Sequence, residues 1–514
     1  RARFGALSTS SPPNSRVAGQ IAKHFRAVSP ALESPPLNSD DFVALGRLLR
    51  WQGQHETGAQ HFEKAIDMGH TQADDLLKEV FIIHRDRLAE EPKELAHRLD
   101  EMLARLGTHR LDVRVWCVEE KLNLAERLGG LEEAEAFLSK EVAQFNESDY
   151  WPQFEFLRCR LLVAMGRDGE AEVRLRALRN QGDALSEVSA MAGWLLGTIL
   201  VGGESEAKWN EALSFFSDVL QQRATGPYAV ASRVGQGAAL AKLNRHEEAI
   251  ASYGKAVKQL GSIEGNRVVS LPALRGSLAV TAEMLRQKGN LRNAVEYAAL
   301  AARLTSSDIC AEKTLFVQPL ALLEEQLAEE ISSGMRIDTN RMGDTVMDAK
   351  FLTQSPEAAR LFASAAQHFG ELADWNIYDE PRSAEFSWKA AELFAKGGAF
   401  DEAGRCYRNF LSQRPEDHRG PTALLRVGQL HYARGELAQA VEAFQECHQR
   451  FPRSFDGARA LVPMARTYLA MGREKLGDAE RALRLVLDDS DVFTPEAGEF
   501  VEGSAETRRV AAVE

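Results

Sequence analysis

The chain has 514 residues, of which 44% are hydrophobic, and its formal net charge is −13. It is too long for one compact core, so about three domains or one extended array are expected. The acidic excess is spread along the chain and disfavours general nucleic-acid binding, and the longest apolar stretch, residues 192–203, is too short and too rich in glycine to span a bilayer.

Residues 1–40 are rich in serine, proline and arginine and are predicted to be a flexible linker. No acidic residue occurs before Glu33, and an Arg- and Ser-rich, acid-poor composition is also typical of the tail of an organelle transit peptide. Both interpretations stay open. The sequence starts at Arg1, so a signal, an anchor or a further domain upstream also stays open.

From about residue 41 onward, apolar residues recur at intervals of three and four, which indicates helices, and short polar turns separate them. The pattern predicts a series of helical hairpins with two interruptions. The expected organisation is an N-terminal helical array over 41–330, an irregular connecting loop over 331–356, a C-terminal array over 357–489 and a tail over 490–514.

Four hairpins share one pattern of small and aromatic residues and align without a gap. The first helix has a small residue, the second helix has another twelve positions later, and an aromatic residue follows four positions after that. In chain order the three positions are filled by Gly46, Gly58 and Phe62; Gly237, Ala249 and Tyr253; Ala391, Ala403 and Tyr407; and Gly428, Ala440 and Phe444. Weaker units place the small residue of the second helix at Ala134, Ala171, Ala212, Ala294 and Ala479.

This pattern has a physical reason, because two helices approach closely only where their side chains are small. Gly428 and Ala440 are therefore expected at a helix crossing, with Phe444 filling the space beside it. Pro452 is expected to end the second helix of that unit, since proline cannot donate to the helical ladder.

The pattern resembles the tetratricopeptide repeat, a unit of about 34 residues that forms two antiparallel helices. The resemblance implies an all-α fold in which hairpins stack into a right-handed superhelical solenoid. The units here are longer than the family's, since Ala403 and Ala440 lie 37 residues apart. One hairpin cannot bury its apolar face alone, so each neighbour covers the last.

In that family the first helices line a concave groove that holds partner peptides, and the resemblance carries this role to matching positions here. The candidate groove residues are Trp388, Lys389, Glu392, Lys396, Leu425, Arg426, Gln429, Tyr432, Arg459 and Arg466. An aromatic ring among basic groups suits an extended acidic segment; ordinary solvated helix faces are the alternative. Some relatives clamp a C-terminal carboxylate with lysines and asparagines, but the asparagines are missing here, which puts that mode in doubt.

Signals for catalysis or metal binding are weak. The chain has no HExxH, P-loop, GxSxG or kinase motif. Three histidines lie closest together in the sequence, His55, His61 and His70, but they are not expected to converge on a metal. Cys447 and His448 are adjacent, so their side chains point about 100° apart on a helix. The five cysteines lie far apart and are expected to be free thiols. No enzymatic activity, cofactor or metal is expected.

Residues 435–454 and 468–487 resemble repeats of bacterial cell-envelope proteins, such as outer-membrane assembly lipoproteins and Tol-Pal accessory proteins. The leading hypothesis is therefore a non-catalytic scaffold or adaptor for protein or peptide partners, in a bacterial envelope assembly. An alternative is the regulatory or substrate-binding array of a larger enzyme, such as a kinase or transferase, whose catalytic domain lies outside this chain. Self-association through the ends is a third hypothesis, and both periplasm and cytoplasm stay open as locations.

Overall fold

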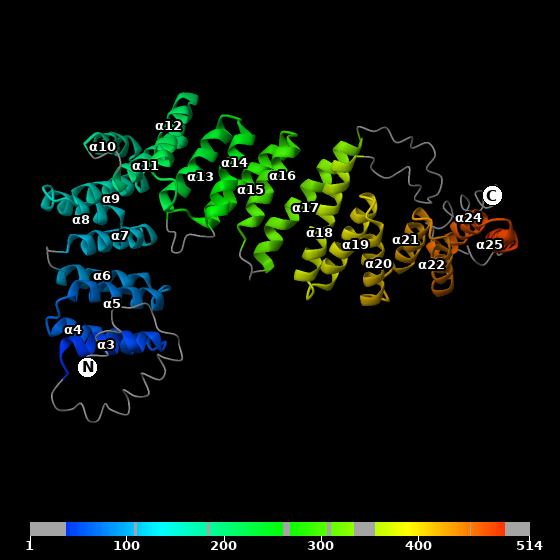
Figure 1. Cartoon of the computed structure of the whole chain (residues 1–514), viewed down its shortest axis with the longest axis horizontal. Coiled ribbons are helices and arrows are strands. Elements are labelled where there is room, and N and C mark those ends of the chain that lie inside the picture. The colour runs from blue at the N-terminus through cyan, green and yellow to red at the C-terminus, as the bar shows by residue number, and fades with distance from the viewer. Residues whose placement is uncertain are drawn as a thin grey trace. The chain divides into compact units, whose positions relative to one another are not determined.

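The computed structural model describes residues 37–106, 110–181, 186–260, 268–305, 310–333, 355–452 and 454–488. Across these ranges the chain forms α-helices and one short 3-10 helix, and no strand, which confirms the predicted all-α class (Figure 1). The chain divides into two compact units between Asn244 and Arg245. Each unit is a stack of helical hairpins.

The first unit consists of five hairpins and the first helix of a sixth. In chain order the helices are α3 (Ser39–Trp51), α4 (His55–Asp67), α5 (Ala73–Arg87), α6 (Pro92–Arg105), α7 (Leu111–Leu128), α8 (Leu131–Gln144), α9 (Trp151–Ala164), α10 (Asp168–Gln181), α11 (Glu187–Gly202), α12 (Glu206–Gln222) and α13 (Pro227–Lys242). Each hairpin packs its second helix against the next hairpin, as α4 packs on α5 and α12 on α13.

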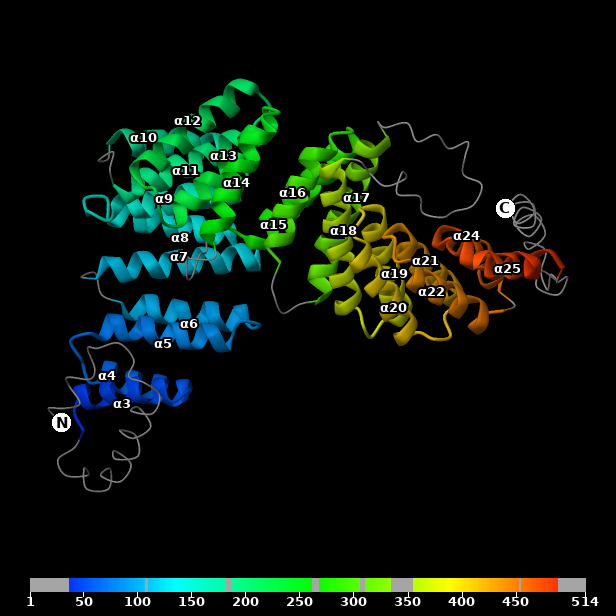
Figure 2. The same cartoon turned by 45° about the vertical axis from the view of Figure 1, so that its right-hand side comes forward.

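The second unit continues in the same manner from α15–α16 to α24–α25 (Figure 2). Its helices are α14 (His246–Leu260), α15 (Leu271–Gln287), α16 (Leu291–Arg303), α17 (Cys310–Ser333), α18 (Pro356–Trp375), α19 (Glu380–Lys396), α20 (Phe400–Gln413), α21 (Gly420–Ala433), α22 (Leu437–Arg450), α23 (Phe455–Arg459), α24 (Leu461–Met471), the 3-10 helix η4 (Arg473–Lys475) and α25 (Leu476–Asp488).

Small residues of the first helices lie directly under aromatic rings of the second helices. A Cβ atom added to Gly428 on α21 would lie 2.5 Å from the Phe444 ring on α22, and one added to Gly46 on α3 would lie 2.4 Å from the Phe62 ring on α4. Gly58 also abuts the backbone of Gly46, where an added Cβ would lie 2.9 Å from the carbonyl oxygen. The two small residues of the first hairpin therefore meet as predicted, and in the other hairpin Gly428 lies against the ring of Phe444.

The other repeat positions are buried as expected. Each predicted small or aromatic position is buried: Gly46, Gly58, Phe62, Gly237, Ala249, Tyr253, Ala391, Ala403, Tyr407, Gly428, Ala440, Phe444, and the weaker Ala134, Ala171, Ala212, Ala294 and Ala479. A further glycine of α13, Gly235, approaches an aromatic ring of the preceding hairpin. Together with Gly197 on α11 it flanks the ring of Phe216 on α12.

The hairpin turns use left-handed backbone where the sequence predicts polar turns. Gly435, between α21 and α22, has φ of 76°, a region that glycine adopts without the steric cost of a Cβ. Helix α22 ends at Arg450, so Pro452 follows the end of the helix as predicted.

The predicted loop over 331–356 is corrected at both of its ends. Residues 331–333 belong to α17, and Pro356 is the first residue of α18, capped by the Ser355 side chain. Residues 334–354 lie outside the described residues. Helices α17 and α18 pack on each other, and one hydrophobic cluster continues from Val317 to Val486. The stack therefore runs through the position where the sequence predicts a break between two arrays.

The predicted tail, 490–514, and residues 1–36 of the predicted linker also lie outside the described residues.

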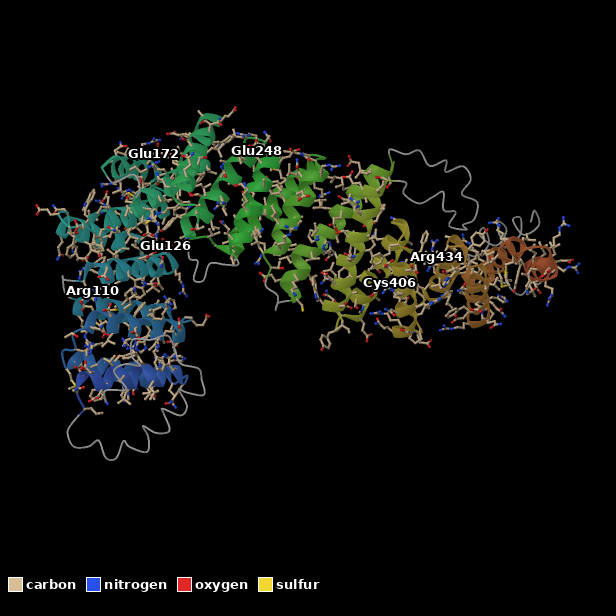
Figure 3. The ribbon with its side chains drawn as sticks, viewed as in Figure 1. Arg110, Glu126, Glu172, Glu248, Cys406 and Arg434 are labelled. Carbon is tan, nitrogen blue, oxygen red and sulfur yellow. The ribbon has the colours of Figure 1, made fainter. Side chains whose placement is uncertain are left out.

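Ion pairs join neighbouring hairpins, and the two residues of such a pair lie roughly one repeat length apart in the sequence. Arg110 donates to both carboxylate oxygens of Asp75, at 2.7 and 2.8 Å, and Arg434 pairs with Asp401 on the preceding hairpin; both arginines are labelled in Figure 3. These pairs are partly exposed, so each contributes about 0–1 kcal/mol. The buried apolar faces supply most of the stability.

The glycine under Phe444 gives a direct test of the crossing. We expect Gly428→Ala to lower the free energy of unfolding by about 1–3 kcal/mol, because the added methyl group overpacks the ring. The matched control is Gly404→Ala on α20, where an added Cβ meets no atom within 4 Å. That variant is expected to gain about 0.5–1 kcal/mol from helix propensity. Urea unfolding monitored by circular dichroism measures the free energy of unfolding of both variants. An equal gain in stability in the two variants would contradict the role of the ring contact.

Candidate protein-binding surface

The first helices of the second unit share one exposed face. We call the exposed sides of α15, α17, α19, α21 and α24 the first-helix face. On α17 the buried side carries Val317, Ala321 and Ala328, whereas Leu315 and Leu322 are exposed. Because a helix buries one side only, the opposite sides of successive first helices are available to a partner.

Side chains on α19 and α17 form a row of polar contacts along this face. Lys389 Nζ lies 2.7 Å from Glu325 Oε1, and Lys396 Nζ lies 2.9 Å from Glu329 Oε1. Burial lowers the pKa of Lys396, but the hydrogen bond and charge of Glu329 raise it more, so its pKa lies above the ordinary value. Both predicted lysines are therefore on the first-helix face, held by carboxylates of the preceding repeat.

Trp388 is part of the packing between α19, α20 and α21. Its ring centroid lies 5.3 Å from that of Tyr407 and 5.4 Å from that of Phe410, both in edge-on geometry. The guanidinium of Arg419 lies over the ring at 5.4 Å, and the same group pairs with Asp417 at 3.0 Å. The half-buried Trp388 is thus occupied by contacts within the chain, which the sequence pattern does not reveal.

Two of the predicted groove residues belong to the core. Leu425 is 3% exposed and Gln429 is 1% exposed. The prediction that these two residues line a groove is wrong, because α21 buries more of its surface than α17 or α19. Arg426, half-buried beside them, donates from Nη1 to Gln429 Oε1 at 3.1 Å.

The remaining predicted positions are partly exposed. Glu392 on α19, Tyr432 on α21, Arg459 at the end of α23 and Arg466 on α24 are all half-buried. Arg459 Nη1 lies 3.9 Å from Asp456 Oδ1, a long ion pair. The structure thus places Lys389, Lys396 and these four residues at the surface of first helices, whereas Leu425 and Gln429 are buried.

Exposed apolar residues on α15 and α17 are the feature that the sequence prediction missed. Val280 is 71% exposed and Leu315 is 66% exposed, with Met284 and Leu322 exposed beside them. They belong to the same three-and-four pattern as the core residues. A closer count of each helix would have shown two apolar stripes on α17 where one is needed for packing.

A buried polar group on α17 is shared with α18, but its geometry is structural. Ser364 Oγ donates to Glu324 Oε1 at 2.8 Å, and His368 Nδ1 lies 2.9 Å from Glu324 Oε2. A serine nucleophile needs its hydroxyl on the base, whereas this hydroxyl donates to the carboxylate. The three residues therefore satisfy one another in the hairpin.

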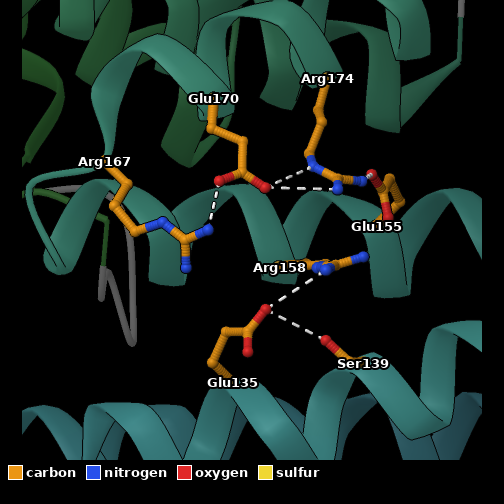
Figure 4. Close-up of polar contacts among 7 residues, drawn as sticks. All are labelled: Glu135, Ser139, Glu155, Arg158, Arg167, Glu170 and Arg174. Atoms are coloured by element: carbon orange, nitrogen blue, oxygen red, sulfur yellow. Dashed lines mark hydrogen bonds and ion pairs between the residues drawn. The ribbon is translucent and has the colours of Figure 1, made fainter.

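The first unit contains a comparable polar network across α8, α9 and α10 (Figure 4). Arg174 donates to Glu155 at 3.0 Å and to Glu170 at 3.3 Å, and Arg158 donates to Glu135 at 3.2 Å. Every carboxylate in this group faces a guanidinium, which is how buried charges are normally stabilised. The ion pairs of this network connect consecutive helices.

Neither a metal site nor a reactive thiol stands out. Within the described ranges no three His, Cys, Asp or Glu side chains are grouped so that they could hold a metal, and no helix there is long and apolar enough to cross a bilayer. All five cysteines are free. Burial raises the pKa of the Cys117, Cys159 and Cys447 thiols to about 12, which keeps them protonated.

Comparison with known proteins identifies the repeats. Residues 422–454 and 232–259 match family models described as tetratricopeptide repeat. No curated protein sequence matches the chain. The resemblance to this repeat, expected from the residue pattern, is confirmed for these two segments, and the resemblance to bacterial envelope proteins finds no counterpart.

Two solved structures resemble the chain at low identity. One is the pHSP90 complex of the TPR2AB domain of yeast Sti1; it is 16% identical, the match covers 55% of this chain and 98% of that chain, and the TM-score is 0.21. The other, the P58(IPK) TPR domain, is 15% identical, covers 87% of this chain and 98% of its own, and has a TM-score of 0.24. At these values the likenesses carry no argument about function.

The Glu324 network makes a prediction about pH. Burial lowers the pKa of His368, but the hydrogen bond and charge of Glu324 outweigh it and raise the pKa above 6.5. A raised pKa means that His368 stabilises the fold fully below pH 6.5 and loses this contribution as the pH rises through the folded-state pKa. We expect thermal stability to fall between pH 6 and 8 more steeply in the native chain than in His368→Gln.

The control for this experiment is a histidine with the opposite shift. Burial lowers the pKa of His246, so its contribution is lost as the pH falls. The variant His246→Gln should therefore leave the decline above pH 6.5 unchanged. Parallel pH profiles for the native chain and His368→Gln would contradict the assignment.

Proposed function

We propose that this chain is a non-catalytic protein-interaction scaffold that binds a segment of a partner protein on the first-helix face of the second unit. The observation that carries the proposal is the first-helix face itself, where apolar and basic side chains reach the surface on consecutive parallel repeats. Stacked hairpins of this kind create extended surfaces from many small contributions. The two tetratricopeptide-repeat segments support the same function.

The charges on this face favour an acidic partner. Lys396 on α19 is 46% exposed although it pairs with Glu329, and Arg426 on α21 donates to the side-chain amide of Gln429. Arg459 and Arg466 lie on the following repeat. A carboxylate of a partner segment could form charge-assisted hydrogen bonds with the exposed part of Lys396 and with Arg426.

We further propose a bacterial envelope assembly as the setting, on the likeness of residues 435–454 and 468–487 to envelope repeats. Fractionation of cells that carry the native gene tests this location. The expected results are recovery of the protein with envelope fractions and crosslinking to an envelope protein. Recovery in the cytoplasm alone would refute the envelope location, but it would not contradict the scaffold function.

The binding face can be tested by quantitative affinity capture with the full chain. We expect the double variant Lys396→Gln/Arg426→Gln to retain its helical circular dichroism but to lose captured partners several-fold. The matched control is Arg405→Gln/Arg481→Gln, which removes two exposed charges from second helices. The proposal fails if no protein is enriched over an empty bait, or if the control loses partners to the same extent.

A further inference from the structure

Helix α25, the last helix that the structure describes, carries a row of leucines beside its core side. Leu476 is 51% exposed, Leu487 is 43% exposed, and Leu483 between them is partly buried. The three residues lie along one side of the helix, because they are spaced by seven and by four. The core side itself is formed by Ala479 and Val486, which are buried. We call Leu476, Leu483 and Leu487 the α25 row.

The same repeat position is covered in earlier hairpins. Leu487 lies eight residues after Ala479, the small residue of its helix, and the equivalent residue on α20 is Leu411, which is 7% exposed. A Cβ added to Gly420, the first residue of α21, would lie 3.7 Å from Leu411 Cδ2. On α8 the equivalent residue is Val142, which is also buried. In a hairpin with a successor, the next first helix thus covers this position.

The sequence after α25 carries a signal for a helix start at the right interval. Residues 489–514 lie outside the described residues, and Pro495 follows Ala479 by 16 residues. Elsewhere a proline in the first turn of the next first helix lies at a similar interval from the small residue: Pro152 of α9 is 18 residues after Ala134, Pro227 of α13 is 15 after Ala212, and Pro421 of α21 is 18 after Ala403. Proline suits the first turn of a helix because its missing N–H needs no partner there.

Residues 494–506 have an apolar side and an acidic side when they are placed on a helix. The small and apolar residues recur at intervals of three and four, at Ala497, Phe500, Val501, Ser504 and Ala505. The opposite side carries Glu499, Glu502 and Glu506. A helix of this kind covers one apolar surface and turns a polar face outward, which is what the end of a repeat stack requires.

We propose that residues 494–506 form a helix that packs on the α25 row as one more first helix and closes this end of the stack. The connection is long enough, because residues 489–493 would join the helix to α25, and residues 414–419 join α20 to α21. The segment is short and contains Gly498 and Gly503, so it is not expected to be helical by itself. Its helix therefore depends on docking.

This inference does not depend on the proposed scaffold function. It concerns the end of the stack, whereas the scaffold function concerns the first-helix face. It implies that the α25 row is covered by the chain's own residues and that self-association does not occur through this end while the helix is docked.

Hydrogen–deuterium exchange of the full chain tests whether the helix is present. In the native chain we expect the amides of residues 497–505 to exchange at least about tenfold more slowly than in a synthetic peptide of residues 489–514, because a docked helix holds its amides in hydrogen bonds. Exchange at the rate of the peptide overturns the proposal.

Substitutions on both partners test where the helix docks. Leu487→Glu and Val501→Glu are each expected to remove the protection of residues 497–505, because each places a charge in the apolar contact. The matched controls are Leu485→Glu, which changes a 45% exposed leucine on the opposite side of α25, and Glu502→Gln on the acidic side; both should keep the protection. Protection that survives Leu487→Glu or Val501→Glu, or that is lost equally in the controls, overturns the proposal.

A dilution series distinguishes the chain's own segment from a second copy of the chain. Exchange and sedimentation velocity are measured together at each protein concentration. We expect the protection of residues 497–505 to stay the same on dilution, because the contact is made within one chain. Protection that rises with the fraction of dimer would assign the α25 row to a second copy and overturn the proposal.

Discussion

Close contact between an aromatic ring on one helix and the backbone of a glycine on its partner is the constraint on which this architecture depends. At Gly46 and Gly428 the ring of Phe62 or Phe444 occupies the volume that any side chain would need. The contact sets how closely the two helices of a hairpin approach. Since hairpins stack through their helices, the spacing within one hairpin also sets the position of the next.

Polar contacts follow from that spacing and do not create it. Pairs such as Arg110–Asp75 and Lys389–Glu325 join residues of successive hairpins, because equivalent positions on parallel helices lie side by side. Where these pairs are exposed, their energy is small, and their effect is to fix which charges remain at the surface. On α19 the result is that Lys389 and Lys396 are paired with carboxylates of α17.

An unusual amount of apolar surface is left on α15 and α17. Single exposed aliphatic residues are common, but contiguous ones mark interaction sites. Val280 and Met284 lie on α15, and Leu315 and Leu322 lie on α17, the next first helix.

Much of the fold could be predicted from residue spacing alone. The interval of twelve between small residues and the aromatic residue four positions later predicted the crossings at Gly46 and Gly428, and the polar turns predicted where helices end. The approach of Gly235 to the Phe216 ring was not predicted, because it joins two hairpins and the residue pattern describes contacts within one. The sequence also predicted a break at 331–356, where helices α17 and α18 in fact form one hairpin.

Local periodicity by itself determined that the chain forms helices, where they turn and which residues are small at the crossings, because these depend on interactions within one hairpin. Exposure was decided only by tertiary structure. Leu425 and Gln429 are buried and Leu315 is exposed, although all three occupy helical positions of similar pattern. The reason is physical: a helix turns the same sequence pattern toward the core or toward solvent according to which neighbouring hairpins cover it, and those neighbours lie 30 or more residues away along the chain.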